Sequence, residues 1–168
     1  DEFQRAVTHA RAADDARAEA ANLYALVQAA YWGPTPVAEG IRRCQEIRDR
    51  AEGSYRVEMS ALHTLAGLHA MAGEFDRARE LGAAAVQIAG KLGPNRFAAL
   101  CSQFLGQVEL LAGDPAAAAR WLRWGAGILE RIGERGLRSE LTAIQRRVEE
   151  TDLPLSTAAD AIALVGLF

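Results

Sequence analysis

The sequence contains only two cysteines, Cys44 and Cys101, and they form no CxxC pair. Two distant cysteines favour buried free thiols in a reducing compartment over a disulfide or a thiolate metal site. No apolar run approaches the roughly 20 residues that span a bilayer, and no basic-then-apolar leader opens the chain. We therefore expect a cytoplasmic protein that has no membrane partner.

The sequence also lacks an excess of positive charge. Its formal net charge is −3, and arginine and glutamate alternate along the chain. The densest basic cluster, residues 42–50, is interrupted by Glu46 and Asp49, which favours a solvated helix face over a phosphate site. Since no large basic field is available to attract phosphates, we expect no nucleic-acid partner.

The motifs of catalysis and cofactor binding are missing as well. Residues 90–92 read GKL rather than the GK[ST] of a phosphate-binding loop, and the GAG at 125–127 has no preceding strand and no third glycine. The three histidines are not spaced as zinc ligands, and no GxSxG segment marks a nucleophilic serine. We expect no enzymatic activity, no metal and no cofactor.

What the sequence does contain is alanine, at about a fifth of all positions, whereas Val, Ile and Thr are sparse. This composition predicts an all-α fold, and half of the residues are apolar, enough for a sizeable core. Gly33, Gly73 and Gly113 follow apolar runs at intervals of 40 residues, and alanines recur five residues after each, at Ala38, Ala78 and Ala118. The chain is therefore predicted to consist of internal repeats of about 40 residues.

Start and stop signals divide each unit into two helices. A glycine able to adopt the left-handed conformation ends the first helix, and a capping residue, followed by proline in two units, begins the second. Residues 2–13 resemble the second helix of a preceding unit. The expected first helices are 16–32, 55–72, 95–112 and 134–150, and the expected second helices are 36–51, 75–92, 115–132 and 156–167.

Small and aromatic residues at fixed positions of the second unit carry a family resemblance: Ala66, Gly73, Phe75, Ala78 and Ala85. The pattern resembles the tetratricopeptide repeat, and Gly106, Gly113 and Ala118 continue it in the third unit. The resemblance implies a right-handed α-α superhelix of about four hairpins. We expect one domain over 1–168, with a partial unit 1–14, repeats 15–53, 54–93 and 94–133, and a degenerate unit 134–168 in which Leu153 replaces the turn glycine.

Several longer stretches are similar to the C-terminal repeat region of bacterial multidomain signalling proteins. These stretches are GPTPVAEGIRRCQEI, AMAGEFDRARELGAAAVQIAGKLG and VELLAGDPAAAARWLRWG. Such proteins join a nucleotide cyclase or a transcription-factor head to an AAA-type NTPase and a helical repeat tail. The resemblance implies a regulatory role, with other domains of the same chain among the possible partners.

The family implies that the first helices of the units line a concave groove. We expect this groove to bind an extended peptide or an amphipathic helix, with one cationic contact to an acidic group. The alternatives are a small-molecule effector site inside the superhelix, and ordinary inter-repeat positions. The expected groove residues are Leu23, Val27, His63, Gln103, Gln107 and Arg147.

Two further expectations concern helix surfaces. The apolar residues of the final segment, 156–168, cover more than one face, so we expect it to dock on the third unit and to support homo-oligomer formation. In the AAAA run of 116–119, Ala118 alone is expected to lie at a close helix crossing. Trp121 and Trp124 are expected on the convex side.

Overall fold

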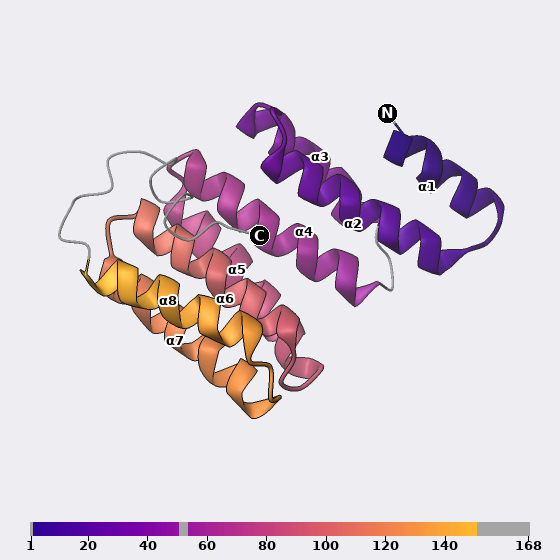
Figure 1. Cartoon of the computed structure of the whole chain (residues 1–168). Helices are drawn as coiled ribbons and strands as arrows, with labels where there is room; N and C mark the ends of the chain where they lie inside the picture. Colours follow the sequence, from indigo (N-terminus) through magenta and orange to yellow (C-terminus); the bar gives the residue numbers. More distant parts are fainter. Residues whose placement is uncertain (1, 51–53, 151–168) are drawn as a thin grey trace.

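The computed structural model describes residues 2–50 and 54–150, which form eight helices and no strand (Figure 1). The helices are α1 (Glu2–Ala12), α2 (Ala16–Trp32), α3 (Val37–Arg50), α4 (Tyr55–Met71), α5 (Phe75–Lys91), α6 (Arg96–Leu111), α7 (Pro115–Arg131) and α8 (Gly136–Glu150). Their bounds fall within two residues of the expected ones. The expected helix 156–167, with its docking and self-association, lies outside the described residues.

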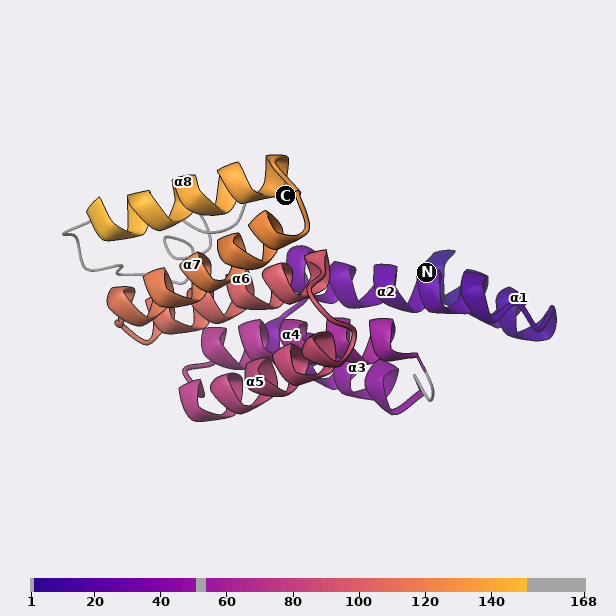
Figure 2. The ribbon, with the colours of Figure 1, turned by 90° about the horizontal axis from the view of Figure 1, so that it is seen from below.

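The helices pack as consecutive pairs, which confirms the all-α repeat solenoid. Each helix contacts the next one along the chain, and α4 also contacts both α2 and α6. In Figure 2 the α6–α7 pair lies against the α4–α5 pair, and α8 lies on the outer side of α7. The helices α2, α4 and α6 therefore form one layer, and α3, α5 and α7 form the other. None of the helices in the described ranges is long and apolar enough to cross a bilayer.

The turns after α4 and α6 use glycine as expected. Gly73 and Gly113 have φ values of 80° and 81°, a region that disfavours side chains with a Cβ. The following residues, Glu74 and Asp114, donate their backbone N–H groups back to His69 and Glu109, which completes the helix ends. Asp114 then begins α7 by accepting a hydrogen bond from the Ala117 N–H at 2.8 Å.

The prediction of the same turn at Gly33 is wrong. Gly33 is extended, with φ −82° and ψ 175°. Pro34 follows directly, and the proline ring favours an extended conformation in the residue before it. A different constraint requires glycine here, since a Cβ would lie 2.4 Å from the Ala29 carbonyl oxygen.

The longer turn at Gly33 also displaces the small-residue column in the first unit. Helix α3 begins four residues after its glycine, whereas α5 and α7 begin two residues after theirs. As a result Ala38 is exposed, and Gly40 occupies the buried position equivalent to Ala78 and Ala118. Ala38 therefore does not share the buried position of Ala78 and Ala118, although it continues their spacing. Gly40 permits close packing there, because a Cβ would lie 3.1 Å from the Ala30 oxygen.

The core consists of two clusters of buried residues, and the cluster that extends from α1 to α7 contains both thiols. Cys44 and Cys101 are buried and free, as expected. Ala118 is fully buried, and its neighbours Ala117 and Ala119 are buried too, with 7% and 5% of their surface exposed. Between α5 and α6, Arg79 donates to both carboxylate oxygens of the nearly buried Glu109, at 2.8 to 3.2 Å.

Candidate interaction site

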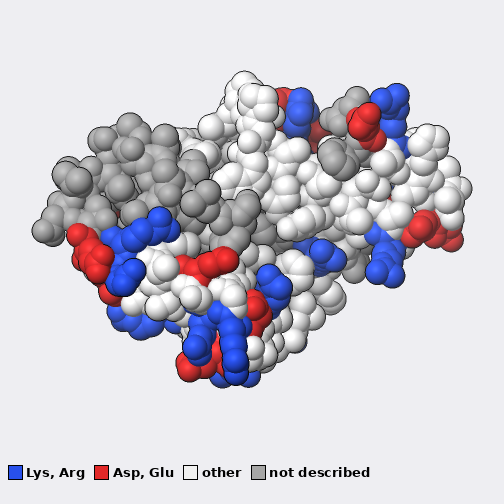
Figure 3. Space-filling model, viewed as in Figure 1, with Lys and Arg blue, Asp and Glu red and all other residues white. Residues whose placement is uncertain are grey.

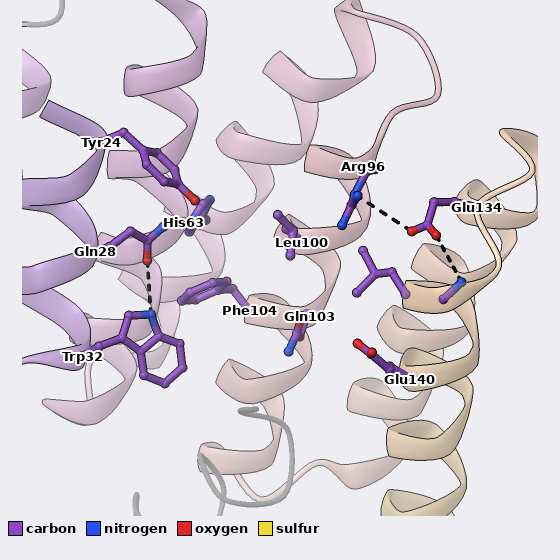
Figure 4. Close-up of a pocket in the computed structure, with 12 residues that line it drawn as sticks. Tyr24, Gln28, Trp32, His63, Arg96, Leu100, Gln103, Phe104, Glu134 and Glu140 are labelled. Carbon is purple, nitrogen blue, oxygen red and sulfur yellow. Dashed lines mark hydrogen bonds and ion pairs between the residues drawn. The ribbon is translucent and has the colours of Figure 1, made fainter. Parts of the chain in front are cut away.

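A pocket of about 650 Å³ opens on the layer formed by α2, α4 and α6, and we call it the inner pocket (Figure 4). The start of α8 closes its opposite side. None of its described lining residues comes from α3, α5 or α7. The lining residues are Tyr24, Gln28, Trp32, His63, Arg96, Leu100, Gln103, Phe104, Glu134, Gly136, Leu137 and Glu140.

The floor of the inner pocket is formed by His63 of α4 and Phe104 of α6. Their ring centroids lie 4.4 Å apart, and His63 is only 2% exposed. Burial lowers the pKa of His63 to about 4, because the charged imidazolium would lose its hydration. The floor therefore presents a neutral imidazole at physiological pH.

His63 also lies near a cysteine that is distant in sequence. The Sγ of Cys101 is 3.9 Å from His63 Nδ1. Burial raises the pKa of the Cys101 thiol to about 12, so the thiol and the imidazole are both neutral near pH 7. A nucleophilic cysteine needs the thiolate form, and this environment opposes it. The pair packs the floor of the pocket and does not resemble an activated nucleophile.

One wall of the pocket is aromatic and held in a fixed orientation. Trp32 is 48% exposed, and its Nε1 donates to Gln28 Oε1, one helical turn earlier, at 3.1 Å. The ring of Tyr31 meets those of Trp32 and Phe104 edge-on, with centroid distances of 4.7 and 5.1 Å. Because the indole is supported from two directions, its open face is available without rearrangement.

A buried hydrogen bond fixes Tyr31 itself. Its hydroxyl donates to Gln107 Oε1 at 2.9 Å, joining α2 to α6 across α4. Burial raises the pKa of Tyr31, so the hydroxyl remains a donor. Gly67 of α4 makes this crossing possible, because a Cβ there would lie 2.6 Å from Tyr31 Cε2.

The opposite end of the pocket is polar. Glu134 Oε1 accepts from the Gly136 N–H at 3.1 Å, and Glu134 Oε2 lies 4.0 Å from Arg96 Nε. This second oxygen is buried and has no hydrogen-bond partner among the described residues. Figure 4 shows the carboxylate of Glu140 directed from α8 toward Gln103.

The structure distributes the expected groove residues over different environments. His63 and Gln103 line the inner pocket, whereas Leu23, Val27 and Gln107 are buried in the helix packing. Arg147 is exposed on α8 and does not line the pocket. The sequence prediction expected α8 to contribute the cation Arg147. The charged group that α8 contributes to the pocket is instead the carboxylate of Glu140.

The pocket residues of α2 differ from the expected ones by one position. The pocket is lined by Tyr24 and Gln28, and the prediction took Leu23 and Val27. Helices α2 and α4 end at Trp32 and Met71, 39 residues apart, so the 40-residue period does not hold between them. An offset of one residue corresponds to a rotation of about 100° around the helix. Leu23 and Val27 therefore face the core, and Tyr24 and Gln28 face the pocket. The exact offset is set by the turn, which the periodic pattern does not encode.

The remaining surface carries mixed charge. On the face shown in Figure 3, Lys and Arg side chains alternate with Asp and Glu. Trp121 and Trp124 of α7 meet edge-on at 5.9 Å, outside the inner pocket. Within the described ranges, no three His, Cys, Asp or Glu side chains gather in a group that could hold a metal ion.

Comparison with known protein families gives a match over part of the chain. Residues 57–131, from α4 to the end of α7, match the family model described as tetratricopeptide repeat. No curated protein and no solved structure matches the chain. Tetratricopeptide repeats generally mediate protein–protein interactions and are generally not enzymes. The match over these residues and the stacked helix pairs together support a fold that resembles the tetratricopeptide repeat.

Proposed function

We propose that this domain is a non-catalytic scaffold that binds a peptide or helical segment of a protein partner in the inner pocket. The observation that carries the proposal is the half-exposed indole of Trp32, held against the pocket by Gln28 and Tyr31. Large aromatic side chains in preformed hollows contribute most of the affinity in many interfaces. A fixed indole also loses little conformational entropy on binding.

The polar groups of the pocket suit a peptide. Gln28 lines the pocket, and its side-chain amide accepts from Trp32 through the oxygen and carries an NH2 group that can donate. A bound segment has its own backbone N–H and C=O groups to satisfy. The pocket therefore combines an apolar anchor point with partners for a polypeptide backbone.

We further infer a regulatory role in a bacterial cytoplasmic signalling protein. In this hypothesis the bound segment belongs to a linked domain or to a separate protein, and binding shifts the activity of a catalytic or DNA-binding head. The full-length reading frame tests this directly, since it either encodes such a head or does not.

The size of the inner pocket favours a second candidate function, the sensing of a small-molecule effector. Its volume of about 650 Å³ lies within the range of ligand pockets, about 300–1,000 Å³. In this alternative a ligand would fill the space between α2 and α8 and alter the curvature of the repeat.

Selection of peptides from a displayed random library against the intact chain tests the proposed function. Selected peptides are then titrated against Trp32→Ala and against the matched control Trp124→Ala, which removes a 40% exposed indole outside the pocket. We expect Trp32→Ala to weaken binding by about 2 kcal/mol, roughly 30-fold, as for an interface anchor. The control is expected to bind as the wild type does.

Equal affinity of the wild type and Trp32→Ala for every selected peptide would overturn the assignment of the pocket. Failure to select any peptide, together with saturable binding of a small molecule at Trp32, would favour the effector site.

A further inference from the structure

We infer that the partner segment carries a lysine or arginine next to a large apolar residue, and that its cationic group binds at the Glu134–Glu140 end of the inner pocket. This inference rests on the proposed function and adds the chemistry of the partner. The apolar residue would pack on Trp32 at the opposite end.

The first observation is the charge that α8 brings to the pocket. Glu140 lines it, and its carboxylate points inward toward Gln103 in Figure 4. None of the described residues forms an ion pair with Glu140. An incoming ammonium or guanidinium would therefore meet a carboxylate that no cation of the described residues neutralises.

The second observation is the Oε2 of Glu134, which faces Arg96 but accepts no hydrogen bond from the described residues. Oε1 is occupied by the Gly136 N–H, which fixes the carboxylate at the start of α8. Oε2 is buried and accepts no hydrogen bond from the described residues, and its nearest cation, Arg96 Nε, is 4.0 Å away. A buried acceptor without a donor is destabilising, so a ligand N–H group would gain a hydrogen bond there once the Glu134 carboxylate turns toward the pocket.

The third observation is the division of the pocket into two ends. Tyr24 and Trp32 lie on the α2 side, and Glu134 and Glu140 lie on the α8 side (Figure 4). Leu100 and Leu137 also line the pocket and offer apolar surface to an alkyl chain. A lysine side chain matches this arrangement, since it can bury its methylene groups and keep its ammonium at the polar end.

The neighbouring cations do not reverse this charge. Arg96 is the one cation among the described lining residues, and it faces Glu134, so Glu140 leaves the lining with a net negative charge. Arg56 is held between the rings of Tyr24 and Phe97, 5.3 Å from each centroid, and does not line the pocket. Arg135, Arg138 and Arg146 line a separate hollow on α8.

The test uses the displayed random library on the intact chain, followed by titration of the selected peptides. Glu140→Gln is compared with Glu2→Gln, which removes an exposed carboxylate of α1 outside the pocket. Loss of one partly exposed charge pair should weaken binding about threefold, and Glu140→Lys should weaken it about tenfold. We expect Glu2→Gln to leave the affinity unchanged. Added salt should weaken wild-type binding more than binding to Glu140→Gln.

Enrichment of Lys or Arg beside an apolar residue, with the expected losses at Glu140, would support the inference. Neutral or acidic peptides that need Trp32 but bind Glu140→Gln as tightly as the wild type would overturn it, and the proposed function would stand. Peptides that do not need Trp32 would overturn the proposed function as well. 2-Phenylethylammonium serves as a separate probe. If no peptide binds and this amine binds in a way that depends on Glu140, the proposed peptide ligand is wrong and the pocket binds a small amine.

Discussion

The hydrogen bond between Tyr31 and Gln107 allows a quantitative test of the packing behind the inner pocket. Tyr31→Phe removes the hydroxyl and leaves the buried Gln107 Oε1 without its donor. Leaving one buried polar group unsatisfied costs about 1–3 kcal/mol, and Gln107→Leu should cost a similar amount by stranding the Tyr31 hydroxyl. The double variant replaces both partners with apolar groups, so its loss should be smaller than the sum of the single losses. We expect a coupling free energy of about 1 kcal/mol.

Urea unfolding of the wild type, the two single variants and the double variant measures this coupling. Far-UV circular dichroism gives the free energy of unfolding for each protein, and unchanged slopes against urea would show that the comparison is valid. Single losses that add to within about 0.3–0.5 kcal/mol would mean that the two side chains act independently. That result would refute the claim that this bond ties α2 to α6.

Four more predictions concern individual positions. Gly82→Ala should destabilise the fold, because its Cβ would lie 2.4 Å from the buried Leu105 Cδ2 and about 1–3 kcal/mol of overpacking outweighs about 1 kcal/mol of helix propensity. A Cβ at Gly90 of the same helix would meet nothing within 4 Å, so Gly90→Ala should raise the free energy of unfolding by up to about 1 kcal/mol in the same urea assay. An equal loss of stability in Gly90→Ala and Gly82→Ala would contradict this reasoning. The pKa of His63 is about 4 in the fold and 6.5 in the unfolded chain, so its contribution to stability is present above pH 6.5 and is lost as the pH falls toward 4, by about 3 kcal/mol in total. Unfolding curves of wild type and His63→Leu at several pH values measure this, and an equal pH dependence would contradict it. Asp114→Ala should lower the thermal midpoint through loss of about 1 kcal/mol of capping, and an unchanged midpoint would count against that cap.

Features of the fold that depend on neighbouring residues could be read from the sequence. Gly73 and Gly113 end their helices in the left-handed conformation, and Asp114 caps the next helix, because each acts through backbone groups only a few residues away. The same local logic was available for Gly93 and Gly133, which end α5 and α7 with positive φ at a spacing of 40 residues. The periodic spacing of these two glycines is a signal that the sequence prediction did not use.

The candidate site was predicted only in part, because it depends on offsets between units. His63 and Gln103 line the inner pocket, but the first unit differs from the 40-residue period, and Tyr24 therefore lines the pocket where Leu23 was expected. Contacts between distant segments, such as Cys101 with His63, have no signature in local sequence. These contacts form only when α4 and α6 pack side by side, so predicting them requires the three-dimensional structure.

The most direct test of the central claim is the map of backbone chemical-shift changes when a selected peptide binds the isotopically labelled chain. We expect the largest changes along the pocket-facing residues of α2, α4 and α6 and at the start of α8, including Trp32, Gln103 and Glu140. Changes concentrated on α3, α5 and α7, with the pocket residues unaffected, would contradict the assignment of the inner pocket as the interaction site.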